Sequence, residues 1–196
     1  MAMTERVTGR FAAAVESDMR AWLERAVIGL NLCPFAKAVH VRGQIHYAVS
    51  PARTPRALAR DLVRELEDLV ALDPQVRDTT LLMAPDCLLD FLDFNDFLAQ
   101  ADRAVVDLGL DGVIQIASFH PDFQFANTSA DDIGNYTNRA PYPTLHLLRE
   151  LSVERAVQAL PQAESIFERN IQTMEKLGRA GWADLGTRRS VPLPEP

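Results

Sequence analysis

The segment from Gly112 to Phe119 constrains the fold most, because it reads Gly-Val-Ile-Gln-Ile-Ala-Ser-Phe and is nearly continuous in apolar residues. A short run of this composition is typical of a strand that is covered on both faces. Such a strand needs helices on both sides of its sheet. We therefore expect a layered arrangement in which this strand lies centrally.

Three segments carry apolar residues at spacings of three and four, the pattern of an amphipathic helix. The first spans residues 8–31, the second begins after Thr54, and the third runs from Asp86 to about Leu108. Thr54 is expected to be the N-cap of the second helix, with Pro55 in its first position, and Asp86 the N-cap of the third. Helices of this length can cover a small sheet.

Short apolar or alternating segments between the helices predict strands. Residues 38–41 and 44–49 flank an Arg-Gly pair and predict a hairpin, and residues 79–84 predict a further strand. If the hairpin turn has two residues, His40 and His46 face opposite sides of the sheet. They could not then share a metal ion.

The C-terminal part predicts one more strand and two helices. Residues 145–149 favour a strand, with a helix as the alternative. Ser152 is then expected to cap a helix that ends at Leu160, and Pro161 to begin another that ends near Leu177.

These elements predict a single α/β domain over residues 1–196, with an α+β arrangement also possible. We expect an initial helix over 8–31, a core over 38–178 with a small mixed sheet of about four or five strands, and a partly flexible tail over 179–196.

The charge of the chain bears on its partners. The net charge is −7, which gives no support to phosphate attraction, so we expect no nucleic-acid partner. Residues 86–111 contribute −6 of it, from seven aspartates and Arg103, so an anionic ligand elsewhere is not disfavoured. We expect no membrane partner, because no apolar run approaches the roughly 20 residues that span a bilayer. Cys33 and Cys87, without a signal peptide, favour the cytoplasm.

A long segment without helical or strand periodicity follows the Gly112–Phe119 strand. It covers 24 residues, from 120 to 143, and includes four aromatic side chains. Loops of this length in compact domains are usually functional or disordered, and aromatic anchors argue against disorder. We expect an ordered, functional loop.

Three segments carry a resemblance to a known family. They are residues 31–37 (Asn-Leu-Cys-Pro-Phe-Ala-Lys), 118–125 (Ser-Phe-His-Pro-Asp-Phe-Gln-Phe) and 135–146 (Asn-Tyr-Thr-Asn-Arg-Ala-Pro-Tyr-Pro-Thr-Leu-His). In these segments the chain resembles a bacterial family catalogued as a domain of unknown function, number fourteen-fifteen. The likeness covers roughly residues 11 to 190. It implies where the family keeps its distinctive residues, and it implies no activity.

His120, Asp122 and Cys33 are the candidate catalytic residues. An imidazole titrates near neutral pH and can transfer protons, and His120 follows directly on the predicted strand. Asp122 alternates to the same side if the strand continues, although Pro121 intervenes. The alternative for His120 is a structural hydrogen bond to backbone. Cys33 could act as a nucleophile, line the pocket or pack inertly, whereas Cys87 is expected to be structural.

Arg139 is the candidate anion-binding residue, because a guanidinium presents a planar fork suited to carboxylate or phosphate. The alternative is an ion pair with Asp131 or Asp132 that pins the loop to itself. The other expected ligand contacts lie in the three matching segments: Asn138, Asn135, Tyr136, His146 and Lys37.

No ligand spacing typical of a metal site occurs, so we expect no metal, and no cofactor can be named. Three functions stay open. The favoured one is an enzyme that acts on a small anionic molecule by acid/base chemistry, at a pocket between the 118–146 loop and the Cys33 turn. The second is a non-catalytic module that binds a small molecule or a protein with the same loop. The third is a structural protein with a packed loop.

Overall fold

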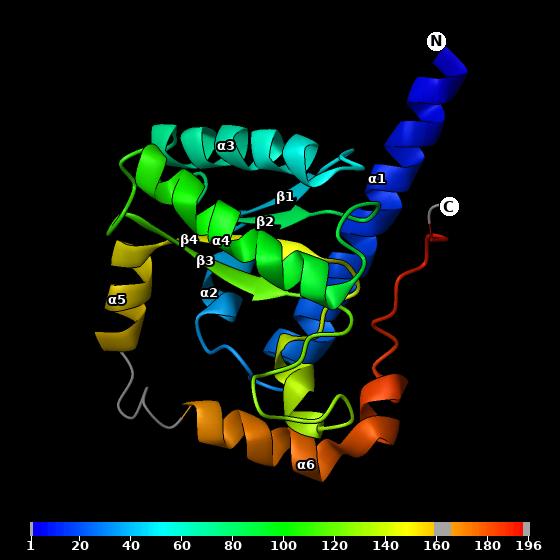
Figure 1. The fold of residues 1–196 in the computed structure, drawn as a ribbon. Helices are drawn as coiled ribbons and strands as arrows, with labels where there is room; N and C mark the ends of the chain where they lie inside the picture. The colour runs from blue at the N-terminus through cyan, green and yellow to red at the C-terminus, as the bar shows by residue number, and fades with distance from the viewer. Residues whose placement is uncertain (1, 159–165, 194–196) are drawn as a thin grey trace.

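Helices cover both faces of a four-stranded mixed sheet, as the computed structural model shows (Figure 1). The structure describes residues 2–158 and 166–193. The strands are β1 (Ile45–Val49), β2 (Thr79–Met83), β3 (Ile114–Phe119) and β4 (Thr144–Arg149), in the order β1-β2-β4-β3. β1 and β2 are parallel, and β4 is antiparallel to both of its neighbours. The predicted single α/β domain and its small mixed sheet are confirmed, as is the strand over 145–149.

The prediction that the Gly112–Phe119 strand is central is wrong. β3 pairs with β4 alone and lies at the edge, while β2 and β4 form the centre. Apolar composition reports whether the two faces of a strand are covered, and not how many strands lie beside it. Ile114 and Ile116 pack in one core cluster, and Phe119 packs in the other, so both faces are covered at an edge position.

One face of the sheet is covered by α3 (Pro55–Ala71) and α4 (Phe91–Asp107). The Thr54 N-cap is confirmed, since its hydroxyl accepts a hydrogen bond from the Ala57 amide at 3.3 Å. The N-cap of α4 is Asp90, and not Asp86 as predicted. Asp90 Oδ1 accepts from the amides of Leu92 and Asp93, at 2.8 and 3.1 Å. The chain before Asp90 cannot be helical, because Leu88 has a φ of 55°.

The other face is covered by α1 (Ala2–Trp22), its π-helical continuation η1 (Leu23–Ile28) and the short α2 (Ala36–Val41). The predicted hairpin is wrong, because its first strand is α2. Gly43, with a φ of 68°, ends that helix: the Gly43 amide donates to His40 O and the Gln44 amide to Val39 O. This is a Schellman motif, so the glycine marks a helix C-terminus and not a hairpin turn.

Two helices follow β4. α5 (Glu150–Gln158) begins directly after the strand, so Ser152 lies inside the helix and is not its cap as predicted. The predicted helix start at Pro161 lies outside the described residues. α6 (Ile166–Asp184) continues beyond Leu177 through a kink at Gly178, where φ is 64°. No helix in the described ranges is long and apolar enough to cross a membrane.

Candidate functional site

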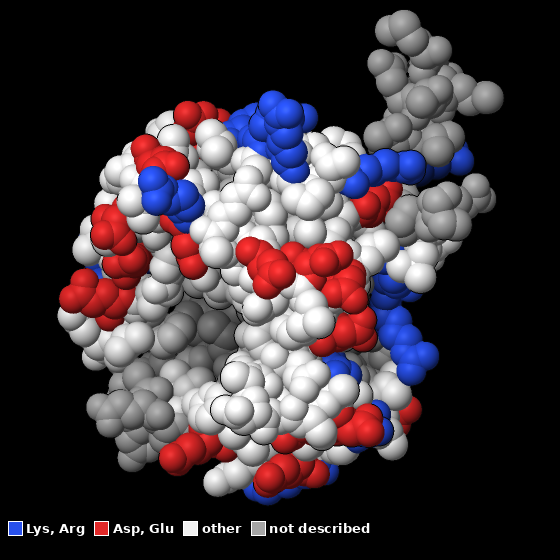
Figure 2. Space-filling view, viewed as in Figure 1, with Lys and Arg blue, Asp and Glu red and all other residues white. Residues whose placement is uncertain are grey.

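A cavity of about 720 Å³ lies against the sheet face that α2 covers. Residues from all four strands form its floor, and its walls come from α2, the 74–78 loop and α5. Figure 2 shows the surface hollowed beside α5, over the region that α2 and β3 occupy in Figure 1. The volume is within the range of about 300–1,000 Å³ typical of small-molecule sites. Most of the lining is apolar, including Trp22, Leu23, Val27, Phe35, Val39, Phe119 and Leu148.

His146 lies in the middle of the cavity floor, on the central strand β4. Its Nε2 is 2.7 Å from the hydroxyl of Thr79, and that hydroxyl donates its only proton to the carbonyl of Leu147, also at 2.7 Å. The hydroxyl can therefore only accept from His146, so Nε2 carries the imidazole proton. Thr79 thus selects the tautomer of His146.

The second ring nitrogen of His146 reaches the cavity. Nδ1 has no hydrogen bond to the described residues. Among those residues, the side-chain atoms that are fully buried without a partner are Tyr47 Oη and Arg149 Nε. Nδ1 is not one of them, so it keeps some accessible surface. Burial lowers the pKa of His146 to about 4, so the ring is neutral at pH 7. The floor of the cavity therefore presents one unprotonated nitrogen, a hydrogen-bond acceptor, in apolar surroundings.

Cys33 lines the same cavity, at the turn before α2. It is a free thiol and is half-buried, and burial raises its pKa above the usual value, although the backbone amides of Phe35 and Ala36 oppose the shift. A raised pKa keeps the sulfur in its thiol form, which is a weak nucleophile. Cys33 therefore contributes a soft wall group, one of the alternatives that the sequence left open.

Charged side chains gather at one end of the cavity. Arg42 at the end of α2 and Arg155 on α5 line it, against the single carboxylate of Asp78. That carboxylate accepts a hydrogen bond from Ser152 Oγ at 2.6 Å. Arg149, at the end of β4, instead donates to the carbonyls of Leu69, Leu72 and Arg77 on the α3 side of the sheet. Arg42 and Arg155 are exposed and form no ion pair with the residues that the structure describes. The mouth therefore carries a positive excess.

His120 lies outside this cavity and is fully buried. Its Nε2 donates to Leu88 O at 3.1 Å, and its Nδ1 accepts from the Asp122 amide at 3.0 Å. The rings of Phe91 and Phe94 lie 5.5 and 5.2 Å from the imidazole. Burial lowers the pKa of His120, and both of its nitrogens are engaged by backbone. This is the structural hydrogen bonding given above as the alternative for His120.

Arg139 binds backbone carbonyls of its own loop. Its Nε donates to Phe123 O at 3.3 Å, a terminal nitrogen donates to Ala130 O at 2.9 Å, and the guanidinium lies 4.2 Å above the ring of Tyr136. Asp131 pairs instead with Arg179 at 2.7 Å. The guanidinium therefore holds the loop together through backbone carbonyls, and not through the carboxylate of Asp131 or Asp132 that the sequence suggested.

The side-chain amides of two asparagines, Asn135 and Asn138, also hold the loop in place. Asn135 is fully buried; its Oδ1 accepts from the Phe125 amide and the Thr128 hydroxyl, and its Nδ2 donates to Ser129 O. Asn138 Nδ2 donates to Ser118 O at 3.2 Å. These residues lie in or beside η2 (Ile133–Asn138), and the loop is ordered as predicted.

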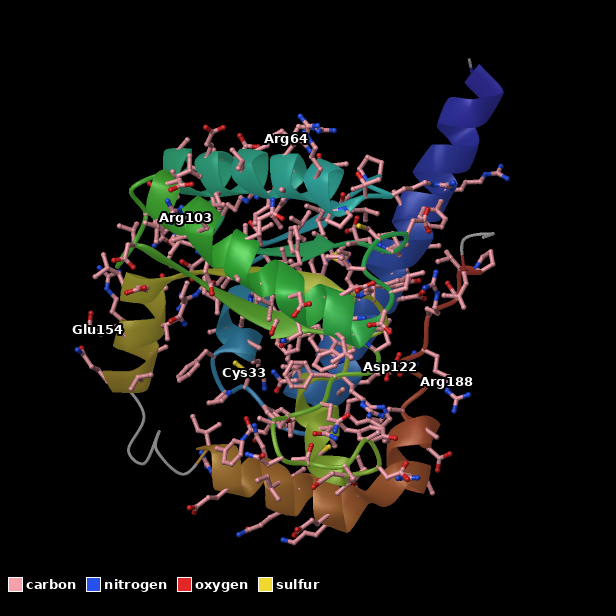
Figure 3. The ribbon with its side chains drawn as sticks, in the orientation of Figure 1. Cys33, Arg64, Arg103, Asp122, Glu154 and Arg188 are labelled. Atoms are coloured by element: carbon pink, nitrogen blue, oxygen red, sulfur yellow. The ribbon has the colours of Figure 1, made fainter. Side chains whose placement is uncertain are left out.

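The structure brings together only part of the predicted site. Cys33 and His146 line the cavity, whereas Lys37 is exposed on α2 and Asp122 is exposed on the loop. Figure 3 labels Cys33 beside α2 and Asp122 well apart from it, toward the C-terminal segment. The sequence did not point to Thr79, Arg42 or Arg155, because nothing in its local pattern distinguishes a strand threonine or a surface arginine that faces a cavity.

No group of three or more His, Cys, Asp or Glu side chains in residues 2–158 and 166–193 could hold a metal ion. His40 lies near Glu24 at 3.4 Å, and His46 lies near Glu65 at 3.6 Å. The two histidines lie on different faces of the sheet, although the hairpin that led us to expect this does not exist.

A family model described as "Protein of unknown function (DUF1415)" matches residues 14–184, most of the chain. The chain belongs to this family. The match confirms the resemblance in the three segments. Two of these segments form the turn and the loop described above, and the third ends at His146 in the cavity floor. No curated protein and no solved structure matched the chain.

Proposed function

We propose that this DUF1415 protein binds a small anionic molecule with an apolar body in the cavity between the sheet and α2. The observation that carries the proposal is the distribution of polar and apolar groups in the cavity, whose walls and floor are apolar and whose mouth has two exposed arginines, Arg42 and Arg155, and one aspartate. An apolar pocket with a few placed polar groups is typical of small-molecule sites. The two free cysteines fit the reducing cytoplasm as its location.

We favour binding over turnover because of the chemistry of the two reactive side chains in the cavity. A base whose pKa is about 4 abstracts protons weakly at neutral pH. The thiol of Cys33, with its raised pKa, is a weak nucleophile. His146 and Cys33 are therefore better suited to contact a ligand than to transform it.

The test is a two-dimensional amide NMR titration with 3-phenylpropanoate, an anion with an apolar ring. We expect a Kd on the order of 1 mM, as for a ligand of few atoms. Amide shifts should concentrate at residues of the cavity floor such as Gln115, Ala117 and Leu148, and not on α4 across the sheet.

Two matched pairs of variants locate the binding. Ala117→Trp fills the cavity and should abolish the shifts, whereas Ala99→Trp places the same ring on the exposed surface of α4 and should not. Arg42→Gln with Arg155→Gln removes two charges at the mouth. At about 0.5–1 kcal/mol per exposed charge pair, this should weaken binding about five- to thirtyfold.

The charge control is Arg56→Gln with Arg60→Gln, which removes two exposed charges from α3 on the opposite face. If these variants weaken binding as much as the mouth variants, the anion does not bind at the cavity mouth. An absence of cavity shifts at saturating 3-phenylpropanoate contradicts the proposal itself.

A further inference from the structure

The floor of the cavity holds one hydrogen-bond acceptor, His146 Nδ1, that has no partner among the described residues. Neutral His146 turns the lone pair of Nδ1 to the cavity, and Thr79 holds the ring in that tautomer through Nε2. The floor around it is apolar, with Leu81 on β2 and Ala117 on β3 as its register partners on the two sides. A purely apolar ligand would cover this nitrogen and leave it without a partner, which costs binding energy.

The positive mouth lies at a defined distance from this nitrogen. Leu148, the next residue of β4 that faces the cavity, is two positions beyond His146, which corresponds to about 7 Å at about 3.4 Å per residue. Its register partner is Thr79, which directly follows the mouth residue Asp78. Arg42 and Arg155 flank the same end. A ligand whose anionic group lies at the mouth therefore extends its apolar body over His146.

From this juxtaposition we infer that the ligand is an amphipathic monoanion that carries a hydroxyl on its apolar body, and that His146 Nδ1 accepts a hydrogen bond from that hydroxyl. The inference rests on the proposed function and adds the substituent that the floor recognises. A neutral acceptor nitrogen selects a hydroxyl or amine donor and discriminates against the same molecule without one. The carboxylate of the ligand is held apart from the ring, at the mouth.

The experiment compares two probes that differ in one hydroxyl, 3-(4-hydroxyphenyl)propanoate and 3-phenylpropanoate. Their dissociation constants are measured by NMR titration on the wild type, on His146→Phe and on His40→Phe. The last is the matched control, because His40 is a histidine of α2 outside the cavity lining. We expect the hydroxylated probe to bind the wild type and His40→Phe about three- to tenfold more tightly. In His146→Phe this ratio should fall to about one, as a lost net hydrogen bond predicts.

A measurement on the wild type makes the test independent of the folding of His146→Phe. The ¹⁵N resonance of His146 Nδ1 should move upfield when the hydroxylated probe binds, because the lone pair then accepts a proton donor. 3-Phenylpropanoate should leave that resonance near its position in the free protein.

The outcomes separate the inference from the proposed function. If both probes bind at the cavity with equal affinity, or the preference survives in His146→Phe with an unmoved Nδ1 resonance, the inference is overturned and the binding proposal stands. If neither probe binds at the cavity, both are overturned. The inference is supported if the wild type binds the hydroxylated probe more tightly, if His146→Phe loses this preference, and if the Nδ1 resonance of the wild type moves upfield.

Discussion

The hydroxyl of Thr79 can be removed with little change of shape by Thr79→Val. This hydroxyl joins His146 Nε2 to the carbonyl of Leu147 through two hydrogen bonds of 2.7 Å, and Thr79 is 4% exposed. Each bond contributes about 0.5–1.5 kcal/mol net, and the added methyl group returns roughly 0.8 kcal/mol. We therefore expect Thr79→Val to lower the free energy of unfolding by about 0.2–2 kcal/mol.

Thr79→Ser is the matched control, because it keeps the hydroxyl and loses only a methyl group, at about 1 kcal/mol. Urea unfolding measures both stabilities. The more specific assay is the ¹⁵N spectrum of the imidazole, which reports which nitrogen carries the proton. The wild type and Thr79→Ser should show His146 protonated on Nε2, and Thr79→Val should show a mixture of tautomers because Nε2 has lost its acceptor.

Two results would refute this reasoning. The first is a wild-type His146 with its proton on Nδ1, since Thr79 would then not select the tautomer. The second is a Thr79→Val protein that keeps both the tautomer and the stability of the wild type. The first result would also remove the basis for an acceptor nitrogen in the cavity.

Three further predictions concern stability. Burial lowers the pKa of His146 to about 4 from 6.5, so the unfolded chain binds the proton first as the pH falls. This contribution to stability is complete above pH 6.5 and should decrease by about 3 kcal/mol between pH 6.5 and 4. Urea unfolding across this range should show a steeper loss of stability in the wild type than in His146→Gln, in which His120 still contributes to the slope. Arg77 and Glu65 form a buried ion pair at 2.5 Å, so Arg77→Met should cost about 3–5 kcal/mol, while Arg77→Met with Glu65→Leu should restore most of it in the same assay, and equal losses in the two proteins would contradict the pairing. Gly43→Ala should lower stability by about 1 kcal/mol in thermal unfolding, because φ is 68° there, and an unchanged midpoint would mean that the α2 terminus differs from the one described.

Local signals in the sequence were sufficient for several elements. Thr54 followed by Pro55 predicts the start of α3 because an N-cap depends on residues within one turn. The same locality explains one error, since an Arg-Gly pair satisfies both a hairpin turn and the end of a helix. Only the packing of Ala36–Val41 against the sheet decides between the two.

The candidate site depended less on local signals. His120 follows a strand, which makes it a reasonable catalytic candidate, but its surroundings are set by Leu88, Phe91 and Phe94 from a segment about 30 residues away. Leu88 O accepts from Nε2 and the two rings cover the imidazole, while the Asp122 amide of the motif itself occupies Nδ1, so no ligand can reach the ring. Nothing within the motif around His120 reveals them, because burial and partners are properties of the assembled layers.

By itself the sequence determined the fold class, the ordered loop and the family, because apolar periodicity, aromatic anchors and motifs are written along the chain. The tertiary structure alone decided the strand order and the cavity. Thr79 and His146 are 67 positions apart, and they meet because β2 and β4 pair at the centre of the sheet. A hydrogen bond between distant strands depends on register, and register is set by the packing of the whole sheet.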